Sequence, residues 1–529
     1  MEKEEERDMK FNTPGHAPIQ AQTTPNAITH EGAPSFKFDS IMELYMAVAT
    51  TLMGEPKFYE SGDERAKRIR RLISKAVQAG ETETVAKLAV YCRETLNLRS
   101  VPIFITVSLA KEMRDQKVEW DGLRRLANRV IQRADEVREM FAAAEQIFGD
   151  AGNNKVFKRI VPKALLKGIG DSLNKFDEYQ ISKYKGGAGA VSFKDVLRVV
   201  HPKPANDSKG ILFAKIMNDT LTPADTWENQ ISNGGSTSEN WQSVADDKKV
   251  GIMAKLRNLR NFVKHNVDLT NVIAHLTNPV AVQNSKQLPF RWYTAYRELG
   301  GQGLKSGGWY YRAPTPEVVA PANLLGALED AFDLSIANLP DLGDDVLIIA
   351  DQSGSMQSPI SQKSTVTCAE IAAVLATGVW YNQTRLGKRA FVAGFADRGK
   401  VYSWSNRTSA LAAAKDMMNT ELGGSTRIDT AWAAAKAAGL KPSTIIVLSD
   451  MQMTGHGRYD TLMNPEAYGL ADANVHKLSV NLQGYDNSPL AVNNGWYQLT
   501  GWSEKIFSFV EAMRNPGDAI NQIKNSVQL

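Results

Sequence analysis

Apolar positions in the first two thirds of the chain recur with the period of amphipathic helices. Within Asp63–Gly80 they fall at i, i+3, i+4, i+7 and i+8, and arginine and lysine residues lie off this face. Gly80 suits the C-terminal cap of such a helix, and Thr82 can cap the next one. The pattern continues, without a strict sequence period, from Phe38 to about Leu334. It predicts a solenoid of irregular helix pairs.

Several further helices and two loops are predicted inside this region. A helix is expected to begin near Ser100, because Pro102 is tolerated in a first turn. The other helical units are Leu123–Phe148, Phe157–Leu173, Phe193–Val200, Val250–Asn266 and Leu324–Ala337. The compositions of Ser232–Asn240 and Gly300–Gly308 are typical of loops.

The pattern changes near Asp345, where short apolar runs begin to alternate with helical segments. Val346–Ala350 is a continuous apolar run, which is typical of a buried parallel strand. Further elements are predicted as strands at Arg389–Phe395, Ser443–Leu448 and Lys477–Leu482, and as helices at Thr365–Val379, Ala410–Met418, Ile428–Ala438 and Ser503–Arg514. This alternation predicts a doubly wound α/β sheet with right-handed crossovers, which binds ligands at the carboxyl ends of its strands.

These patterns divide the chain into three parts. Residues 1–35 are rich in Thr, Pro, Asn, Gln and Gly and are predicted to form an extended arm. Residues 36–340 form the helical region, and residues 341–529 form the α/β domain.

The composition is that of a globular protein. The 529 residues are 43% hydrophobic and 23% charged, which excludes wholesale disorder. No apolar run approaches about 18 residues and the N-terminus is charged, so we expect neither a membrane span nor a secretory signal. Cys92 and Cys368 lie in apolar helical patterns and are expected in the core, which excludes a disulfide scaffold or a Cys-rich zinc site. We expect a soluble, cytoplasmic protein.

Charge is unevenly distributed along the chain. Residues 1–340 hold 46 basic and 41 acidic residues, whereas residues 341–529 hold 16 and 17. Within the helical region, Lys155–Lys203 holds 11 basic and 4 acidic residues. Such a local excess indicates either a surface for a polyanion or a solvated lysine-rich face.

Oxygen-bearing side chains follow two predicted strands and begin one predicted helix. Asp351, Ser353 and Ser355 come directly after the first strand, Asp450 follows the third, and Thr426 precedes a helix. Carboxylates, hydroxyls and waters form an oxygen-only site, which suits Mg²⁺ or Mn²⁺ better than zinc. In the alternative interpretation, these residues only cap helices.

This arrangement resembles the metal-ion-dependent adhesion site of von Willebrand factor A-like domains, whose pattern is Asp-x-Ser-x-Ser, then Thr, then Asp. The resemblance assigns Asp351, Ser353, Ser355, Thr426 and Asp450 as ligands. If the preceding glycine pair is aligned without a gap, Ser425 substitutes for Thr426. The resemblance implies an ion that keeps one coordination position open for an acidic group of a partner. Alternatively, the ion is structural, or the site stays empty.

Motifs in the helical region resemble the TROVE module of the Ro autoantigen family. The matching segments are Thr29–Pro34, Lys163–Gly170, Ile181–Lys185, Phe193–Pro204 and Leu256–Arg260. A helical region followed at once by a von Willebrand factor A-like domain is also the order of that family. The resemblance covers roughly residues 29–515.

The resemblance implies a closed ring of HEAT-like helical repeats with a central hole. It implies Y-like small noncoding RNA on a basic outer surface, contacted by Lys183 and His201, with Lys185 as a substitute for Lys183. It also implies binding of the single-stranded 3′ ends of misfolded RNA in the hole. Cooperation with polynucleotide phosphorylase or another exoribonuclease in noncoding RNA quality control, as an RNA-tethered adaptor, is a further implication.

The basic residues themselves are consistent with RNA binding. If residues 155–167 form one helix, a lysine-rich stripe lines one face, although Pro162 can kink or restart the helix. The residues of this cluster and its neighbours are Lys155, Lys158, Arg159, Lys163, Lys167, Arg198 and Lys203. A second basic group, placed as a guess on the inner wall of the ring, comprises Lys255, Arg257, Arg260, Lys264 and His265.

Signatures of common enzyme classes are missing. The sequence has no P-loop, no Gly-x-Ser-x-Gly nucleophile elbow and no His-Glu-x-x-His motif, so we predict no catalytic site. A metal-dependent nuclease would need more acidic ligands than the pattern offers. The alternative to an RNA-binding ring is a metal-dependent protein-binding scaffold without an RNA function.

Overall fold

The structure is a computed structural model of the chain. The structure describes residues 25–49, 62–149, 154–184, 191–223, 227–285, 287, 289–300, 318–359, 366–455, 463–490, 495–501 and 519–529. The predicted loop Gly300–Gly308 after its first residue, and the predicted helix Ser503–Arg514, lie outside these residues.

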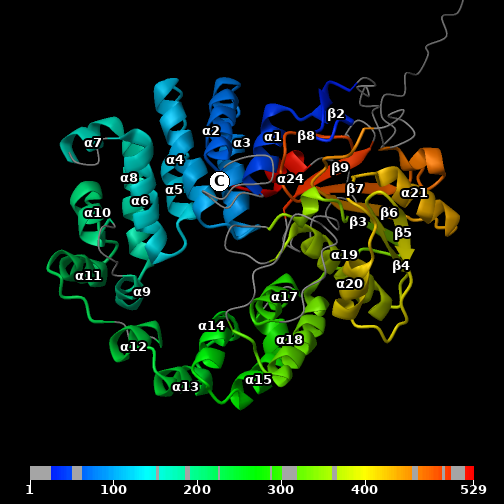
Figure 1. The fold of residues 1–529 in the computed structure, drawn as a ribbon. Coiled ribbons are helices and arrows are strands. Elements are labelled where there is room, and N and C mark those ends of the chain that lie inside the picture. Colours follow the sequence, from blue (N-terminus) through cyan, green and yellow to red (C-terminus); the bar gives the residue numbers. More distant parts are fainter. Residues whose placement is uncertain are drawn as a thin grey trace, which may run out of the picture.

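The first part of the chain is a succession of helices that follows a ring (Figure 1). The helices are α1 (Ser40–Ala49), α2 (Gly62–Gln78), α3 (Thr82–Glu94), α4 (Ser100–Asp115), α5 (Leu123–Val130), α6 (Ala134–Phe148), α7 (Asn154–Ile160), α8 (Lys163–Ser172), α9 (Glu178–Lys183), α10 (Phe193–Val200), α11 (Asp207–Met217), α12 (Trp227–Gly234), α13 (Ser238–Asp246), α14 (Ile252–Lys264), α15 (Thr270–Leu276), α16 (Pro279–Ser285), α17 (Pro289–Glu298) and α18 (Ala322–Ser335). Most of them bury an apolar face, as the periodicity predicted, whereas Trp227 and Ile231 of α12 are only partly buried.

The second part is an α/β domain that completes the ring. Its strands are β3 (Val346–Asp351), β4 (Ala390–Phe395), β5 (Gly399–Tyr402), β6 (Thr444–Ser449), β7 (His476–Asn481) and β9 (Trp496–Thr500), in the order β5-β4-β3-β6-β7-β9. Only the pairing of β4 with β5 is antiparallel among these described strands. The helices are α19 (Cys368–Arg385), α20 (Ala410–Asn419), α21 (Ile428–Ala437) and α24 (Ala519–Ser526). The fold is therefore the predicted helical ring with a doubly wound sheet.

The sheet has two differently covered faces. Alternate residues such as Ile348 and Val392 join α19, α20 and the ring helices in one continuous core. The other face, with Leu347 and Phe395, packs against α21 and its Trp432. Since one face of the sheet shares its core with the ring, the two predicted domains are not packed as separate units.

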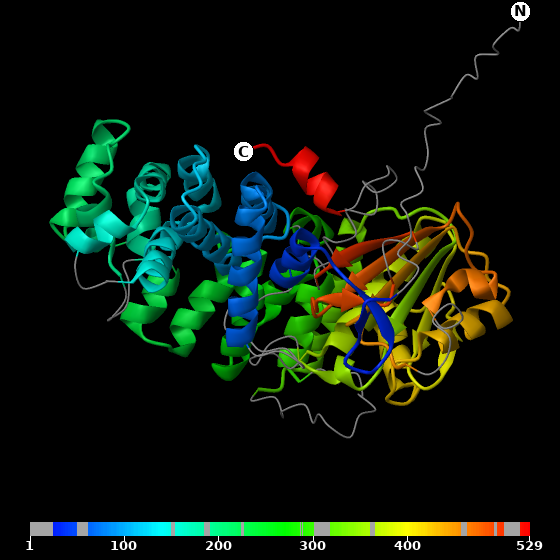
Figure 2. The ribbon, with the colours of Figure 1, turned by 90° about the horizontal axis from the view of Figure 1, so that it is seen from above.

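The N-terminal segment belongs with the α/β domain. Strands β1 (Ala27–Ile28) and β2 (Pro34–Lys37) form a hairpin, and β2 pairs with β8 (Asn487–Ser488). Figure 2 shows this hairpin, in blue, lying against the sheet. The described part of the predicted arm is thus extended, and β2 crosses the expected boundary at residue 35.

Some local expectations were wrong. The helix after Gly80 begins at Thr82 itself with Glu81 as its N-cap, so Thr82 lies inside the first turn. Most of Ser232–Asn240 is helical, because α12 runs to Gly234 and α13 begins at Ser238, where the Thr237 side chain caps it. The antiparallel edge strand β5 and the strand β9 were not predicted.

Buried charged side chains join the ring to the α/β domain at both of its ends. Near the first helix, Arg65 is 1% exposed and donates to the backbone oxygen of Gln483 at 2.7 Å. Near the last helices, Glu370 of α19 accepts hydrogen bonds from Arg297 Nε and from the Tyr293 hydroxyl of α17, each at 2.8 Å. These contacts hold the two ends of the helical array against one sheet.

We expect Glu370→Gln to destabilise the whole chain by about 3–5 kcal/mol, because it leaves the buried Arg297 guanidinium without its counter-charge. Chemical denaturation followed by circular dichroism measures the change. The matched control is Glu329→Gln, which breaks the more exposed ion pair of Glu329 with Lys415 across α18 and α20 and should cost about 0–1 kcal/mol. An equal decrease of the free energy of unfolding in both variants would contradict a special role of the buried contact between Glu370 and Arg297.

Candidate functional site: a basic rim, an arginine pocket and a buried carboxylate pair

The predicted lysine stripe is divided between two helices. Pro162 is the N-cap of α8, so α7 ends before it and residues 155–167 do not form one helix. The interruption follows from the missing backbone N–H of proline. Lys155, Arg159, Lys163 and Lys167 are nevertheless all exposed on these two helices.

A glycine determines how α8 lies against its neighbour. A Cβ on Gly168 would lie 2.6 Å from the backbone oxygen of Arg124 and 2.7 Å from Ala127 Cβ, so only glycine permits this approach of α8 to α5. The ion pair between Arg124 Nε and Asp171 Oδ2, at 2.5 Å, spans the same two helices. Gly168 therefore places Lys163 and Lys167 on the solvent side of the packed pair.

His201 joins this basic surface from a third helix. It ends α10, as predicted for a residue before proline. Its backbone is left-handed, with φ 43°, rather than in the extended conformation that usually precedes proline. Its Nε2 atom lies 2.9 Å from Lys158 Nζ, which also donates to the backbone oxygen of Arg198 at 3.2 Å. We call the following residues the rim patch: Lys158, Arg159, Lys163, Lys167 and His201.

Lys183 lies apart from the rim patch. It ends α9, which packs near the start of α6, whereas α7 follows the end of α6. Lys183 Nζ pairs with Glu228 Oε1 of α12 at 2.8 Å, and so helps to hold α9 to α12. Lys185 lies outside the described residues. Lys203 is exposed, and Arg198 pairs with Asp195 at 3.6 Å.

A second basic surface faces the inside of the ring. A pocket of about 460 Å³ lies between the starts of α4 and α6 and the helices α14 and α17. Figure 1 shows these helices bordering the inside of the ring. The charged lining of the pocket consists of Arg99, Arg133, Arg257, Arg260, Arg291 and Glu298. We call the five arginines the arginine pocket. The excess of guanidinium groups makes it a favourable place for phosphate.

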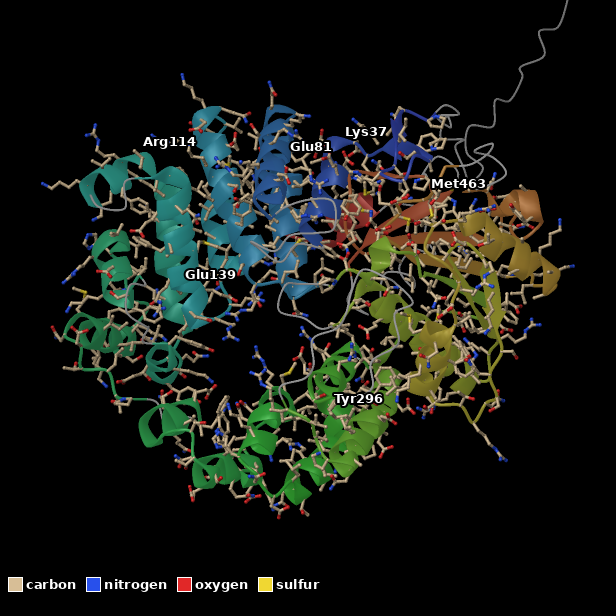
Figure 3. The ribbon with its side chains drawn as sticks, in the orientation of Figure 1. Lys37, Glu81, Arg114, Glu139, Tyr296 and Met463 are labelled. Atoms are coloured by element: carbon tan, nitrogen blue, oxygen red, sulfur yellow. The ribbon has the colours of Figure 1, made fainter. Side chains whose placement is uncertain are left out.

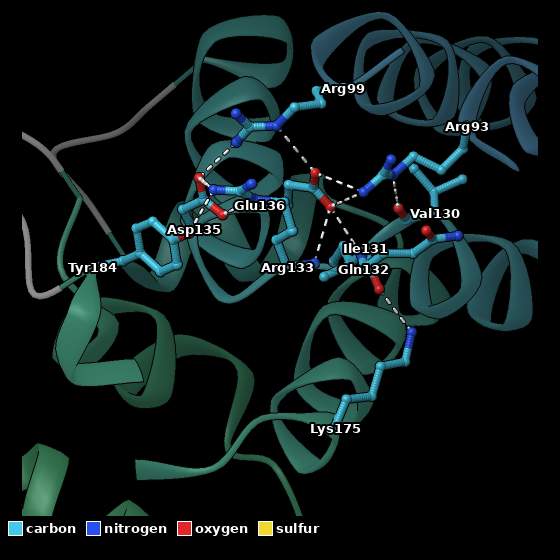
Figure 4. Close-up of polar contacts among 10 residues, drawn as sticks. All are labelled: Arg93, Arg99, Val130, Ile131, Gln132, Arg133, Asp135, Glu136, Lys175 and Tyr184. Atoms are coloured by element: carbon cyan, nitrogen blue, oxygen red, sulfur yellow. Dashed lines mark hydrogen bonds and ion pairs between the residues drawn. The ribbon is translucent and has the colours of Figure 1, made fainter. Parts of the chain in front are cut away.

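A buried carboxylate orients part of the arginine pocket. Glu136 is fully buried at the start of α6 and accepts from Arg93 Nη2 at 2.9 Å and from the Gln132 backbone at 2.9 Å (Figure 4). The preceding residue of the helix, Asp135, accepts from Arg99 Nη2 at 2.6 Å. Arg133 lies over the Tyr184 ring at 5.2 Å. The start of α6 is therefore a fixed platform for Arg99 and Arg133.

Only part of the guessed inner-wall group lies there. Arg257 and Arg260 line the pocket, but Lys255 is 2% exposed and donates to the Ala245 backbone oxygen at 2.7 Å. Lys255 is buried because it shares a helix face with Leu259 and Phe262. His265 Nε2 lies 3.0 Å from Ser236 Oγ. Arg99, Arg133 and Arg291 were missed, and their wide separation in the sequence gave no signal.

Two carboxylates are buried side by side at the carboxyl ends of β3 and β6. Asp351 accepts from the Ser353 backbone at 2.9 Å and from Ser449 Oγ at 2.5 Å, and Asp450 accepts from the Gln452 backbone at 3.0 Å. Burial, with the nearby charge of Asp450, raises the pKa of Asp351 to about 7. Burial raises the pKa of Asp450 to about 6. Two like charges in a dry site are costly unless something neutralises them.

Several buried oxygen atoms in and around this carboxylate pair make no well-formed hydrogen bond. Ser353 Oγ, Ser355 Oγ and Asp450 Oδ2 are buried and make no hydrogen bond of good geometry among the described residues. Ser353 nevertheless lies close enough to Asp351, and Ser355 to Asp450, to lower the pKa of that carboxyl against the effect of burial. Buried oxygens of this kind fit a hard cation. No group of three or more His, Cys, Asp or Glu side chains that could hold a metal occurs within the described ranges.

The geometry distinguishes Thr426 from Ser425. Ser425 turns to the exposed carboxylate of Asp397, which accepts from its backbone N–H at 3.1 Å and from its hydroxyl. Thr426 is 2% exposed and is bonded to Thr454 in both directions, each at 2.9 Å. Thr426 therefore lies with the loop that follows Asp450, and Ser425 does not.

The N-terminal segment packs against this same loop, which the sequence did not indicate. Thr29 Oγ1 donates to the Met453 backbone oxygen at 2.7 Å, and the His30 backbone donates to Gln452 Oε1 at 2.7 Å. Thr29–Pro34 is thus a structural part of the carboxylate site.

We expect the free energy of unfolding in metal-free buffer to fall as the pH rises from about 4 to about 7. The folded chain holds protons on the carboxylate pair at a pH where an unfolded aspartate, with a pKa near 4, has lost them, so protonation favours the folded state in this window. Denaturant titrations in EDTA across this range measure the slope. Asp450→Asn should make the free energy of unfolding depend less on pH. An unchanged slope would contradict repulsion between Asp351 and Asp450.

Comparisons with known proteins agree with this architecture. A family model described as the TROVE domain matches residues 217–310, which include the predicted segment Leu256–Arg260. Telomerase protein component 1 of Rattus norvegicus is 28% identical over 160 residues, which is 29% of this chain and 6% of that protein. The Mus musculus protein of the same name is 32% identical over 82 residues, 15% of this chain and 3% of its own length.

The fold also matches a solved structure. The crystal structure of the Deinococcus radiodurans Ro (Rsr) protein superposes with a TM-score of 0.58 and covers 90% of this chain and 100% of its own, at 17% sequence identity. No helix in the described part of this chain is long and apolar enough to cross a membrane. The chain therefore contains a segment that matches the TROVE domain, and it has the fold of the Deinococcus Ro protein.

Proposed function

We propose that the chain is an RNA-binding protein of the Ro type, which forms a ribonucleoprotein. The arginine pocket carries this proposal, because five guanidinium groups from four distant parts of the chain converge inside the ring. Asp135 and Glu136 neutralise part of the charge of Arg99 and Arg133, but the lining holds more guanidinium groups than carboxylates and stays basic. RNA phosphates are the polyanion that the TROVE match favours for such a surface. The occupant proposed for the arginine pocket is the single-stranded 3′ end of a misfolded RNA.

The rim patch is proposed as the surface for a structured RNA of the Y-like class. Its lysines carry point charges on exposed helices, which suits contact with phosphates without reading bases. Such binding is expected to weaken steeply with salt and to tolerate changes of sequence. With both surfaces occupied, the proposed role is noncoding RNA quality control, or the tethering of an exoribonuclease such as polynucleotide phosphorylase through the bound RNA.

The carboxylate pair is proposed to hold Mg²⁺ or Mn²⁺. The residues that would hold it are Asp351, Ser353, Ser355, Thr426 and Asp450, and the unused buried oxygens support this assignment. When bound, the ion supplies a Lewis-acidic position for an acidic group of a partner protein. The same observation favours the second candidate, a metal-dependent protein-binding scaffold without an RNA function.

We expect the two basic surfaces to be separable with two RNAs, a closed hairpin and the same hairpin with a single-stranded 3′ tail. Arg257→Gln with Arg260→Gln should remove the extra affinity given by the tail, while Lys158→Gln with Lys163→Gln should weaken both RNAs by roughly tenfold or more. Filter binding across a salt series measures both effects.

A matched control for these variants is Lys436→Gln, which removes an exposed charge from α21 of the α/β domain. Wild-type protein that binds neither RNA at low salt would refute the RNA function and leave the scaffold alternative. Loss of binding through the control variant as well would refute the assignment to these two surfaces.

We expect Mg²⁺ to raise the Tm of the wild-type chain and not that of Asp351→Ala, because the variant lacks one of the two buried carboxylates. RNA affinity should stay unchanged in Asp351→Ala, since the rim patch and the arginine pocket lie on other elements. Asp397→Ala is the control, because Asp397 is exposed and binds Ser425 outside the carboxylate pair. A folded Asp351→Ala variant that no longer binds RNA would show that the two functions are coupled.

A further inference from the structure

A groove outside the arginine pocket combines an aromatic platform with a basic border. It has a volume of about 780 Å³ and lies between the end of α4, the segment from Gln116 to Gly122, and helices α7 and α8. Met113, Ile160 and Pro162 contribute apolar walls, and Trp120 lines it from the segment after α4. The volume falls in the range of pockets that enclose a small molecule or a single nucleotide, roughly 300–1,000 Å³.

Trp120 is held in place from below. Its indole rests on Gly122, where a Cβ would lie 2.1 Å from the ring atom Cζ2, so a larger residue at this position would displace the ring. The segment that carries it is anchored by the Val118 backbone, which donates to Met113 at 2.8 Å, and by Gln116 Nε2, which donates to Ser74 at 3.0 Å. The indole is half-buried, so part of it remains available to the groove.

Basic and acidic side chains lie on different sides of the groove. Arg114, Lys158, Arg159 and Lys163 form its basic border on α4, α7 and α8. Glu119 and Asp121 flank Trp120, and Asp121 lies 3.8 Å from Arg125. A bound phosphate is therefore favoured on the α7 side, away from these carboxylates.

The groove is continuous with the rim patch. Lys158 lines the groove, and its Nζ atom lies 2.9 Å from His201 Nε2 on the rim. An RNA that crosses the rim patch would thus pass the open side of the groove. A paired base cannot leave its stack to reach Trp120, whereas an unpaired base can stack on an aromatic ring.

We propose that this groove binds one unpaired nucleotide of an RNA, with the base on Trp120 and the phosphate at Lys158 and Lys163. The inference rests on the proposed RNA function and extends it, because it gives the rim a preference for RNA that carries a bulge or a flipped nucleotide. The lysines alone would bind any duplex of equal charge.

The test uses the full chain and two RNA hairpins that differ only by a single unpaired adenosine in the stem. Wild type should bind the bulged hairpin more tightly, and Trp120→Ala should lose this preference, a change of roughly 5- to 100-fold for one stacked base. Trp120→Phe should keep most of the preference for the bulged hairpin. Gly122→Ala keeps the indole but displaces it, and should behave as Trp120→Ala does.

The controls separate this inference from the RNA function itself. Lys167→Gln, which changes an exposed rim-patch lysine that does not line the groove, should weaken both hairpins alike. Tyr179→Ala, which removes an aromatic side chain that is 49% exposed on α9, should change neither. A folded Trp120→Ala variant that still prefers the bulge would overturn the groove, while hairpin binding through the rim would stand. Competition by a glutamate-rich peptide but not by adenosine monophosphate would assign the groove to an acidic protein segment and overturn it too. No binding of either hairpin to wild type would refute the RNA function.

Discussion

The structure depends on the closure of the helical array onto a single sheet at both of its ends. At one end the buried Arg65 donates to the backbone oxygen of Gln483 beyond β7, and at the other the buried Glu370 accepts from Arg297 and Tyr293 of α17. An unpaired charge in such a place is strongly destabilising, so neither part reaches its full stability without the other. Because the ring helices share a core with one face of the sheet, closure is also a matter of apolar burial.

Closure places two kinds of electrostatic surface in different parts of the molecule. Cations collect on exposed helices of the rim and inside the ring, where water and counter-ions reach them. The carboxylates Asp351 and Asp450 lie buried in the α/β domain, on the ends of strands. The formal net charge of +4 does not reveal this separation, because it is the sum over a basic helical region and a nearly neutral domain. Figure 3 shows how the side chains are spread over both parts of the ring.

Local patterns predicted much of the fold, and long-range contacts account for what they missed. Phe193–Val200 has the bounds its periodicity predicted, and the strands before Asp351 and Asp450 were found from apolar runs. The arginine pocket could not be predicted, because Arg99 and Arg257 meet only through closure of the ring. Lys255 was wrongly grouped with the basic residues of the inner wall. The grouping used its charge and overlooked that it lies on the buried face of α14.

The docking of the N-terminal hairpin has a consequence for biosynthesis. The hydrogen bond from Thr29 to Met453 joins residues 424 positions apart, so the hairpin stays without its binding surface until the ribosome has made most of the chain. The helices that are synthesised first therefore form an open array whose apolar surfaces are exposed to solvent. Chaperones bind such exposed apolar surfaces. Late docking of the N-terminal hairpin would then mark the step at which chaperones release the protein.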